Sequence, residues 1–178
     1  MTPPTEPVPS SPGRWLPTVA LGLWAVVTGA LALLPITDPD LGFHIAWGRL
    51  LQSDFGAART ETWGQAPGVL RYAYSYWLYQ VSTAWAYDHL GPAALVLSRT
   101  ATILATAALG IALARRHGAS WFGCLGGLVL FTAISHERFV DRPDLISHLL
   151  WLIAIGILLD GRRRTLWWLV PLQVVWAN

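Results

Sequence analysis

The stretch WLPTVALGLWAVVTGALALLPI, residues 15–36, contains no ionisable side chain. At about 1.5 Å per residue, a helix of this length can cross a hydrocarbon core about 30 Å thick. Further apolar runs occupy residues 93–114, 119–134, 143–160 and 165–178. The whole chain is 54% hydrophobic and only 12% charged, and a soluble domain usually carries about twice that charged fraction. The sequence therefore predicts an all-α fold, a polytopic transmembrane helical bundle of five spans.

Residues 37–90 have mixed polarity and separate the first predicted span from the second. Asp38 followed by Pro39 is typical of a helix start, with Asp38 as the N-cap. The helix predicted from there to about residue 53 carries Phe43 and Trp47 on one side, together with Leu50 and Leu51, so we expect it to lie in the membrane interface. After a glycine-rich loop, a second aromatic helix is predicted over about residues 71–90.

Arginine bias predicts the orientation of the chain. Arg14, the pair at 115–116 and the triplet at 162–164 fall on one side if five spans alternate, and that side should be the cytoplasm. The N-terminus is then cytoplasmic, with residues 1–14 as a disordered tail rich in Pro and Ser. Residues 37–90 and 135–142 are extracytoplasmic. A cleaved signal peptide ending near Ala30-Leu31-Ala32 is the alternative for the first run.

Several classes of function are disfavoured by composition. The arginines are scattered, whereas a nucleic-acid site needs basic residues gathered on one face. The single cysteine, Cys124, forbids an internal disulfide. The histidines do not have the spacing of metal ligands, and the phosphate-binding and hydrolase motifs are missing. The apolar run that ends at Asn178 has no polar flank, so we expect the chain to be truncated at its C-terminus.

The first candidate site follows the first span. Asp40 and His44 are four residues apart and share one helical face, with Asp38 close by. A carboxylate beside an imidazole could act as a general base or, with a further ligand, bind a divalent cation such as Mg or Mn. The alternative is local: Asp38 caps a helix, and Asp40 interacts with its dipole.

The second candidate site is the extracytoplasmic loop that contains Arg138 and Arg142. Arginines on this side run against the positive-inside bias, and guanidinium groups match phosphate oxygens, so a phosphate-bearing lipid is one explanation. An Arg–Asp pair that closes the loop is the other. Arg99 stands alone inside the second span, where it either points into a polar cavity or, as we expect, snorkels to the interface.

These residues resemble the opening of the C-type (GT-C) glycosyltransferase fold, as found in bacterial polytopic membrane proteins. The similarity covers about residues 15–178, through short motifs. One departure is Tyr76, because many relatives carry Glu immediately before the Trp-Leu step. The matching positions are Asp38, Asp40, Phe43, His44, Trp47, Gly48, Trp77, Leu78, Arg142, Pro143, Asp144, Trp176, Ala177 and Asn178.

The resemblance implies a protein of the bacterial inner membrane that transfers a sugar from a polyprenyl-phosphate donor on the extracytoplasmic face, with inversion. Asp38 or Asp40 would be the catalytic base, and Asp40 could hold a divalent metal. Arg138 and Arg142 would bind the donor phosphate, and His44 and Arg99 are further candidates for substrate binding. The alternative is a non-enzymatic membrane protein that binds, moves or scaffolds lipid-linked envelope intermediates.

Overall fold

The structure is a computed structural model that describes residues 15–56 and 76–177, and within these ranges it is helical and free of strands. The predicted tail, residues 1–14, lies outside the described residues, as do the predicted loop and the start of the second aromatic helix, residues 57–75. The helices are α1 (Leu16–Ala32), α2 (Asp40–Ser53), α3 (Trp77–Leu90), α4 (Pro92–Arg116), α5 (Trp121–Ser135), the short 3-10 helix η2 (His136–Arg138), α6 (Pro143–Asp160), α7 (Arg163–Leu166) and α8 (Leu169–Trp176).

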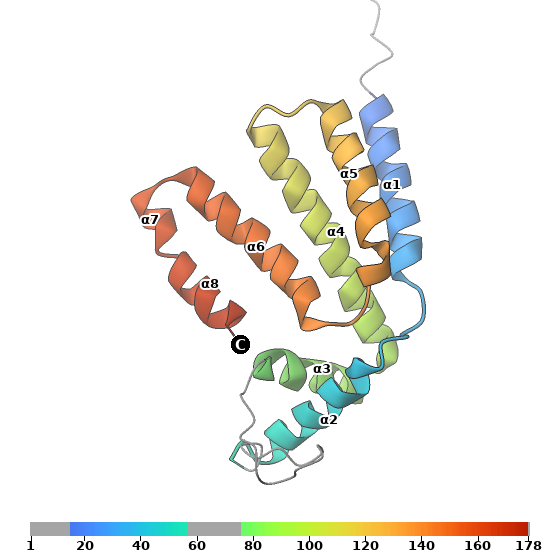
Figure 1. The fold of residues 1–178 in the computed structure, drawn as a ribbon, viewed down its shortest axis with the longest axis vertical. Coiled ribbons are helices and arrows are strands. Elements are labelled where there is room, and N and C mark those ends of the chain that lie inside the picture. Colours follow the sequence, from blue (N-terminus) through green and yellow to red (C-terminus); the bar gives the residue numbers. More distant parts are fainter. Residues whose placement is uncertain (1–14, 57–75, 178) are drawn as a thin grey trace, which may run out of the picture.

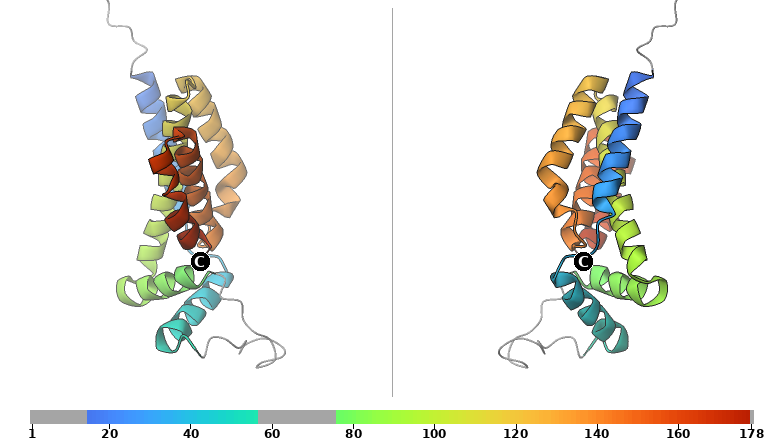
Figure 2. Two further views of the ribbon diagram at one scale, coloured as in Figure 1. Left: turned by 90° about the vertical axis from the view of Figure 1, so that its left-hand side faces the viewer. Right: turned by 90° about the vertical axis from the view of Figure 1, so that its right-hand side faces the viewer.

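Four long helices, α1, α4, α5 and α6, form a bundle, and α2 and α3 lie across one end of it (Figure 1). The side views in Figure 2 show the same separation of the bundle from the α2–α3 pair. A side-chain hydrogen bond joins α1 to α5 within the bundle: the indole N–H of Trp24 donates to the hydroxyl of Thr132 at 2.9 Å. Among the described residues, α4 and α6 are long and apolar enough to cross a membrane, and α1 is a shorter apolar helix.

The fifth predicted span is not one helix. Residues 163–176 form the short helices α7 and α8, which are separated at Trp167 and Trp168. Pro171 explains the interruption, because its ring lacks an N–H and clashes with the carbonyl of Trp167, four residues earlier. The bounds of α4, α5 and α6 agree with the predicted runs to within a few residues. Within residues 15–56 and 76–177, however, only α4 and α6 qualify as membrane spans by length and composition.

The two ends of the bundle differ in their charged residues. The start of α1, the α4–α5 turn and the α6–α7 turn all lie at the top of Figure 1. Arg115 and Arg116 close α4 at this end, and Arg163 and Arg164 lie in α7. The α1–α2 connection and the η2–α6 connection lie at the opposite end, beside α2 and α3. Residues 33–39 and 139–142, which make these two connections, are called the loop junction below.

The start of α2 corrects one sequence-based assignment. The helix begins at Asp40 with Pro39 at the N-cap position, so Asp38 stands one residue before the cap. Asp38 nevertheless accepts a hydrogen bond from the Asp40 N–H at 3.0 Å. Its carboxylate therefore satisfies one of the backbone donors that a helix start leaves unpaired.

The packing of α2 against α3 depends on a glycine. A Cβ added at Gly48 would lie only 2.0 Å from the backbone oxygen of Gln80 on α3, so the two backbones approach as closely as Gly allows. Ile45 and Trp47 flank this contact on the buried face of α2. Phe43 lies on the predicted apolar side, because its ring packs edge-on against Trp47 with centroids 6.0 Å apart, but it is 44% exposed while the face that contacts α3 is buried.

The close contact predicts that Gly48→Ala destabilises the α2–α3 pair. Overpacking of this kind typically costs about 1–3 kcal/mol, and the relief of helical Gly by Ala offsets only about 1 kcal/mol of it. Gly42→Ala on the same helix is the matched control, since a Cβ there meets nothing within 4 Å. Thermal unfolding of the purified protein in micelles measures both. Equal transition temperatures for the two variants would show that the approach at Gly48 is not tight.

Candidate functional site

The loop junction brings together charged residues that are about a hundred positions apart in the sequence. Arg142, which immediately precedes α6, forms an ion pair with Asp38 with its Nε 2.6 Å from Oδ2. Its Nη2 donates to Oδ1 of the same carboxylate at 3.1 Å and to Oδ2 of Asp40 at 2.8 Å. One guanidinium therefore bridges both aspartates of the first predicted site, and we call these three residues the Asp38–Arg142–Asp40 cluster.

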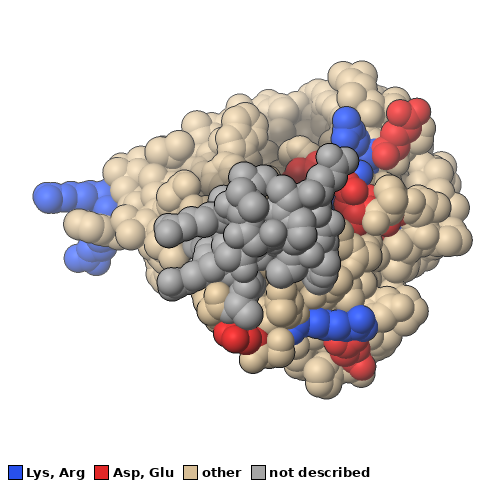
Figure 3. Space-filling view, turned by 60° about the horizontal axis from the view of Figure 1, so that its bottom comes forward, with Lys and Arg blue, Asp and Glu red and all other residues tan. Residues whose placement is uncertain are grey.

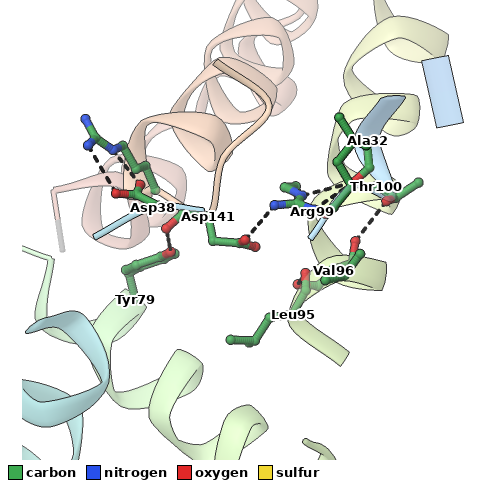
Figure 4. A network of polar contacts seen from close by, with 11 residues as sticks. Ala32, Asp38, Tyr79, Leu95, Val96, Arg99, Thr100 and Asp141 are labelled. Atoms are coloured by element: carbon green, nitrogen blue, oxygen red, sulfur yellow. Dashed lines mark hydrogen bonds and ion pairs between the residues drawn. The ribbon is translucent and has the colours of Figure 1, made fainter. Parts of the chain in front are cut away.

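A second arginine holds the two connections of the junction together from inside the bundle. Arg99 on α4 has a side chain only 3% exposed, and its Nη1 lies 2.8 Å from the carboxylate of Asp141 (Figure 4). The same guanidinium donates to the carbonyl of Ala32, at 3.1 Å from Nε and 2.8 Å from Nη2, and also to the carbonyl of Leu34. Arg99 thus satisfies the carbonyls at the end of α1 and the acid that precedes Arg142.

This position contradicts the expectation that Arg99 snorkels to the interface. Its guanidinium points inward because acceptors are available there: an arginine stays charged, and its N–H groups need partners when they are removed from water. The Arg99 guanidinium already binds Asp141 and two backbone carbonyls, so in this structure it connects segments of the fold. Its assignment to substrate binding stays a prediction.

Helix α3 adds a contact to the same junction. The Tyr79 hydroxyl donates a hydrogen bond of 2.6 Å to the backbone carbonyl of Asp141. Burial raises the pKa of Tyr79 well above its usual value, so the phenol stays protonated and keeps this donor. Burial also raises the pKa of the Asp141 carboxyl, against the opposing effect of Arg99. Residue 141 is therefore held through its side chain by α4 and through its backbone by α3.

The two aspartates of the cluster have different surroundings. Asp38 has a side chain only 2% exposed, and its hydrogen bond from Arg142 lowers the pKa of its carboxyl below the usual range, although burial opposes this. Asp40 has a side chain 58% exposed and also lies against Arg142. Of the two, only Asp40 presents carboxylate oxygen to a molecule that approaches from outside.

The cluster does not fit the divalent metal that the sequence allowed at Asp40. Both oxygens of Asp38 accept hydrogen bonds, from Arg142 and from the Asp40 N–H, and Oδ2 of Asp40 also faces the guanidinium. The positive charge between the two carboxylates is thus already supplied by an arginine. Among residues 15–56 and 76–177, no group of three His, Cys, Asp or Glu side chains is placed to hold a metal ion.

His44 lies beside the cluster but faces α3. It is 8% exposed, packs edge-on against Tyr79 with ring centroids 5.2 Å apart, and its Nδ1 lies 3.5 Å from the amide nitrogen of Gln80. Burial lowers its pKa, while Asp40 and Asp38 oppose the shift. A neutral, packed imidazole of this kind supports the α2–α3 contact more than it reaches a substrate, so its binding role remains a prediction.

The two arginines that the sequence paired as phosphate ligands are in different situations. Arg142 is bound to two carboxylates, and its side chain is 34% exposed. Arg138, at the end of η2, is exposed and has no ion-pair partner within the part of the chain that the structure describes. It lines one end of an open groove of about 690 Å³ between α4, α5 and α6.

Only part of the charge of the junction reaches the surface at the α2–α3 end: Asp40 and Arg142 are accessible, whereas Asp38 and Asp141 are buried. Figure 3, which brings this end forward, shows arginine and acidic side chains side by side on the surface.

Sequence reasoning identified three members of the cluster, Asp38, Asp40 and Arg142. Sequence reasoning did not connect Asp141 with Tyr79 and Arg99. These residues lie on a loop, on α3 and on α4, and they meet only through tertiary packing. A lone arginine in an apolar run was the one available signal that a buried acid had to exist elsewhere.

Comparison of the chain with known protein families, with curated proteins and with solved structures finds no match. The description of the site therefore rests on its own geometry: a buried arginine that fixes two connections, an exposed carboxylate beside a bridged guanidinium, and an arginine at the end of an apolar groove.

The buried Arg99–Asp141 pair predicts a large loss of stability when one partner is removed. Arg99→Gln leaves the Asp141 carboxylate buried without a cation, which typically costs about 3–5 kcal/mol. Arg49→Gln is the matched control, because the Arg49–Asp88 pair is exposed and exposed pairs contribute little. Chemical unfolding in micelles compares the two variants. Restoration of stability in the double variant Arg99→Gln with Asp141→Asn would confirm the pairing, whereas equal losses for Arg99→Gln and Arg49→Gln would contradict it.

The lowered pKa of Asp38 predicts a dependence of stability on pH. Arg142 favours the ionised carboxylate in the folded state, so Asp38 stabilises the fold above the unfolded pKa of about 3.9 and loses this contribution as the pH falls through its lowered folded pKa. Asp38→Asn should therefore reduce the unfolding temperature most at neutral pH, and the difference from wild type should shrink below about pH 4. A difference that does not change with pH would show that charge plays no part. Glu137→Gln, at an exposed acid, is the control.

Proposed function

We propose that this protein is a polytopic membrane protein of the glycosyltransferase type that transfers a sugar from a polyprenyl-phosphate donor at the extracytoplasmic face. The observation that carries the proposal is the exposed carboxylate of Asp40, held 2.8 Å from a guanidinium that is itself fixed by the buried Asp38. An exposed base of fixed orientation at the end of a helical bundle is suited to accept a proton from a hydroxyl group. The arginines at the opposite end favour a cytoplasmic location for that end.

In this proposal the two aspartates have separate roles. Asp40 accepts the proton of the acceptor hydroxyl, whose oxygen attacks the anomeric carbon of the donor. The bond from that carbon to the phosphate oxygen breaks, and the bonding electrons leave with the polyprenyl phosphate, so the configuration at the anomeric carbon inverts. Asp38 keeps Arg142 in position and does not reach substrate, because its side chain is buried and both of its oxygens are bonded. The positive charge beside the base comes from Arg142 rather than from a metal.

The proposal predicts that Asp40→Asn abolishes transfer. The amide keeps the size of the side chain but cannot accept the proton, and loss of a general base typically costs about 10²–10⁴ in rate. Membranes that contain the protein are incubated with labelled polyprenyl-phosphate sugars, and release of sugar to an acceptor is measured. Glu137→Gln is the matched control, because it removes an exposed acid outside the cluster and should leave transfer unchanged. Full activity of Asp40→Asn would eliminate the catalytic assignment.

The second candidate function is binding or movement of lipid-linked intermediates without catalysis. The exposed Arg138 beside an apolar groove favours it independently of the aspartates. The two functions differ in how they respond to the same pair of variants. A binding protein would lose its effect on envelope assembly with Arg138→Gln and keep it with Asp40→Asn, whereas a transferase would lose it with either.

A further inference from the structure

The α4–α5 and α6–α7 turns, at the end of the bundle opposite the loop junction, are rich in arginine (Figure 1). Residues 115–116 are two arginines that close α4, and residues 162–164 are three further arginines that lead into α7. Across residues 111–121 and 158–168, these five arginines are accompanied by a single acid, Asp160. All five are exposed, and we call them the basic patch.

Asp160, at the end of α6, joins the two segments of the basic patch. Its Oδ1 accepts a hydrogen bond of 2.9 Å from Nη2 of Arg116 at the end of α4, and its Oδ2 accepts one of 2.7 Å from the hydroxyl of Thr165 on α7. Arg162 lies farther away, with its Nε 3.8 Å from Oδ2. The Asp160 side chain is only 14% exposed, so this carboxylate connects α4 and α7 to the end of α6 and presents little negative charge to the outside.

The other guanidinium groups of the basic patch are open to solvent. Arg163 and Arg164 have no ion-pair partner within the part of the chain that the structure describes, and the Arg162 side chain is 79% exposed. Arg115 packs over the ring of Trp121, 4.4 Å from the ring centroid, which leaves its charge without a counter-ion. Because guanidinium groups match phosphate oxygens, the patch is complementary to an anionic partner that carries phosphate.

Exposed tryptophans beside the basic patch favour a membrane lipid over a soluble anion as this partner. Trp167 and Trp168 follow α7 directly and are 70% and 66% exposed. Tryptophan rings are favoured at the level of the lipid headgroups. The two helices long and apolar enough to cross a membrane among the described residues, α4 and α6, both end at this patch. A bilayer that they cross therefore has the phosphates of one leaflet level with these arginines.

We propose that the basic patch binds the phosphate groups of anionic membrane phospholipids of the phosphatidylglycerol type, with the arginines 162–164 as the main ligands and Trp167 and Trp168 beside the lipid. Clusters of about four to eight basic side chains next to a membrane span bind anionic lipid in this way. The patch lies at the other end of the bundle from the Asp38–Arg142–Asp40 cluster, so the inference does not depend on a transfer reaction. Binding there fixes α7 at one leaflet and, through Asp160, the ends of α4 and α6 with it.

Quenching of tryptophan fluorescence by brominated lipid tests this inference, because bromine quenches only the rings that it approaches closely. The full chain is reconstituted into phosphatidylcholine vesicles that contain either brominated phosphatidylglycerol or brominated phosphatidylcholine at the same mole fraction. Brominated phosphatidylglycerol should quench more, and the excess should shrink as salt screens the charges. The excess should also disappear when Trp167→Phe and Trp168→Phe are combined, because these two rings lie beside the proposed site.

Arginine variants measure how much the charge contributes. Arg163→Gln and Arg164→Gln should each lower the binding of phosphatidylglycerol relative to phosphatidylcholine about fivefold, as expected for one basic side chain beside an anionic surface. The double variant Arg163→Lys with Arg164→Lys should keep most of the preference because it keeps both charges. Arg49→Gln is the matched control, since it removes an exposed guanidinium at the α2–α3 end and should leave the preference unchanged.

Three results would overturn the inference: equal quenching by the two brominated lipids, equal effects of Arg163→Gln and Arg49→Gln, or an excess that persists in the double phenylalanine variant. Displacement of the excess by soluble glycerol phosphate would also overturn it, because the patch would then be a site for a free phosphate. The assay involves no sugar transfer, so an inactive protein that keeps the lipid preference would contradict the proposed function alone.

Discussion

The guanidinium of Arg99 is the interaction on which the junction depends. It cannot lose its charge under physiological conditions, and inside an apolar bundle it needs several acceptors. The fold provides them from two distant segments: the carbonyls of Ala32 and Leu34 at the end of α1, and the carboxylate of Asp141. Because one rigid group binds both segments, the loop that carries Asp38 and the loop that carries Arg142 are held side by side.

This arrangement explains why a buried charge is retained where an apolar side chain would pack more simply. An ion pair in the interior contributes little net stability compared with a well-packed apolar pair, but removal of one partner is costly. Arg99 and Asp141 therefore fix a single alignment of the two connections. The adjacent residue, Arg142, is then placed within hydrogen-bonding distance of Asp38 and Asp40, so a structural pair next to the cluster determines the geometry of the cluster.

The proposed chemistry uses the difference between the exposed and the buried members of the junction. Asp38 and Arg99 are buried and bonded, which makes them supports. In the proposed function, the exposed Asp40 and Arg138 are the groups that meet substrate. The same division accounts for the absence of a metal from the proposed step, because the guanidinium of Arg142 already lies between the carboxylates.

The sequence by itself determined the all-helical class, most of the helix bounds and the two aspartates and two arginines of the loops, because apolar runs, prolines and charge positions are local properties of the chain. It was wrong about the snorkelling of Arg99 and the single helix over residues 165–178. Only the tertiary structure decided that Arg142 binds both aspartates while Arg138 stays open to the groove. Which arginine meets which acid depends on how α1, α4 and α6 pack, and residues about a hundred positions apart leave no periodic signal of that choice.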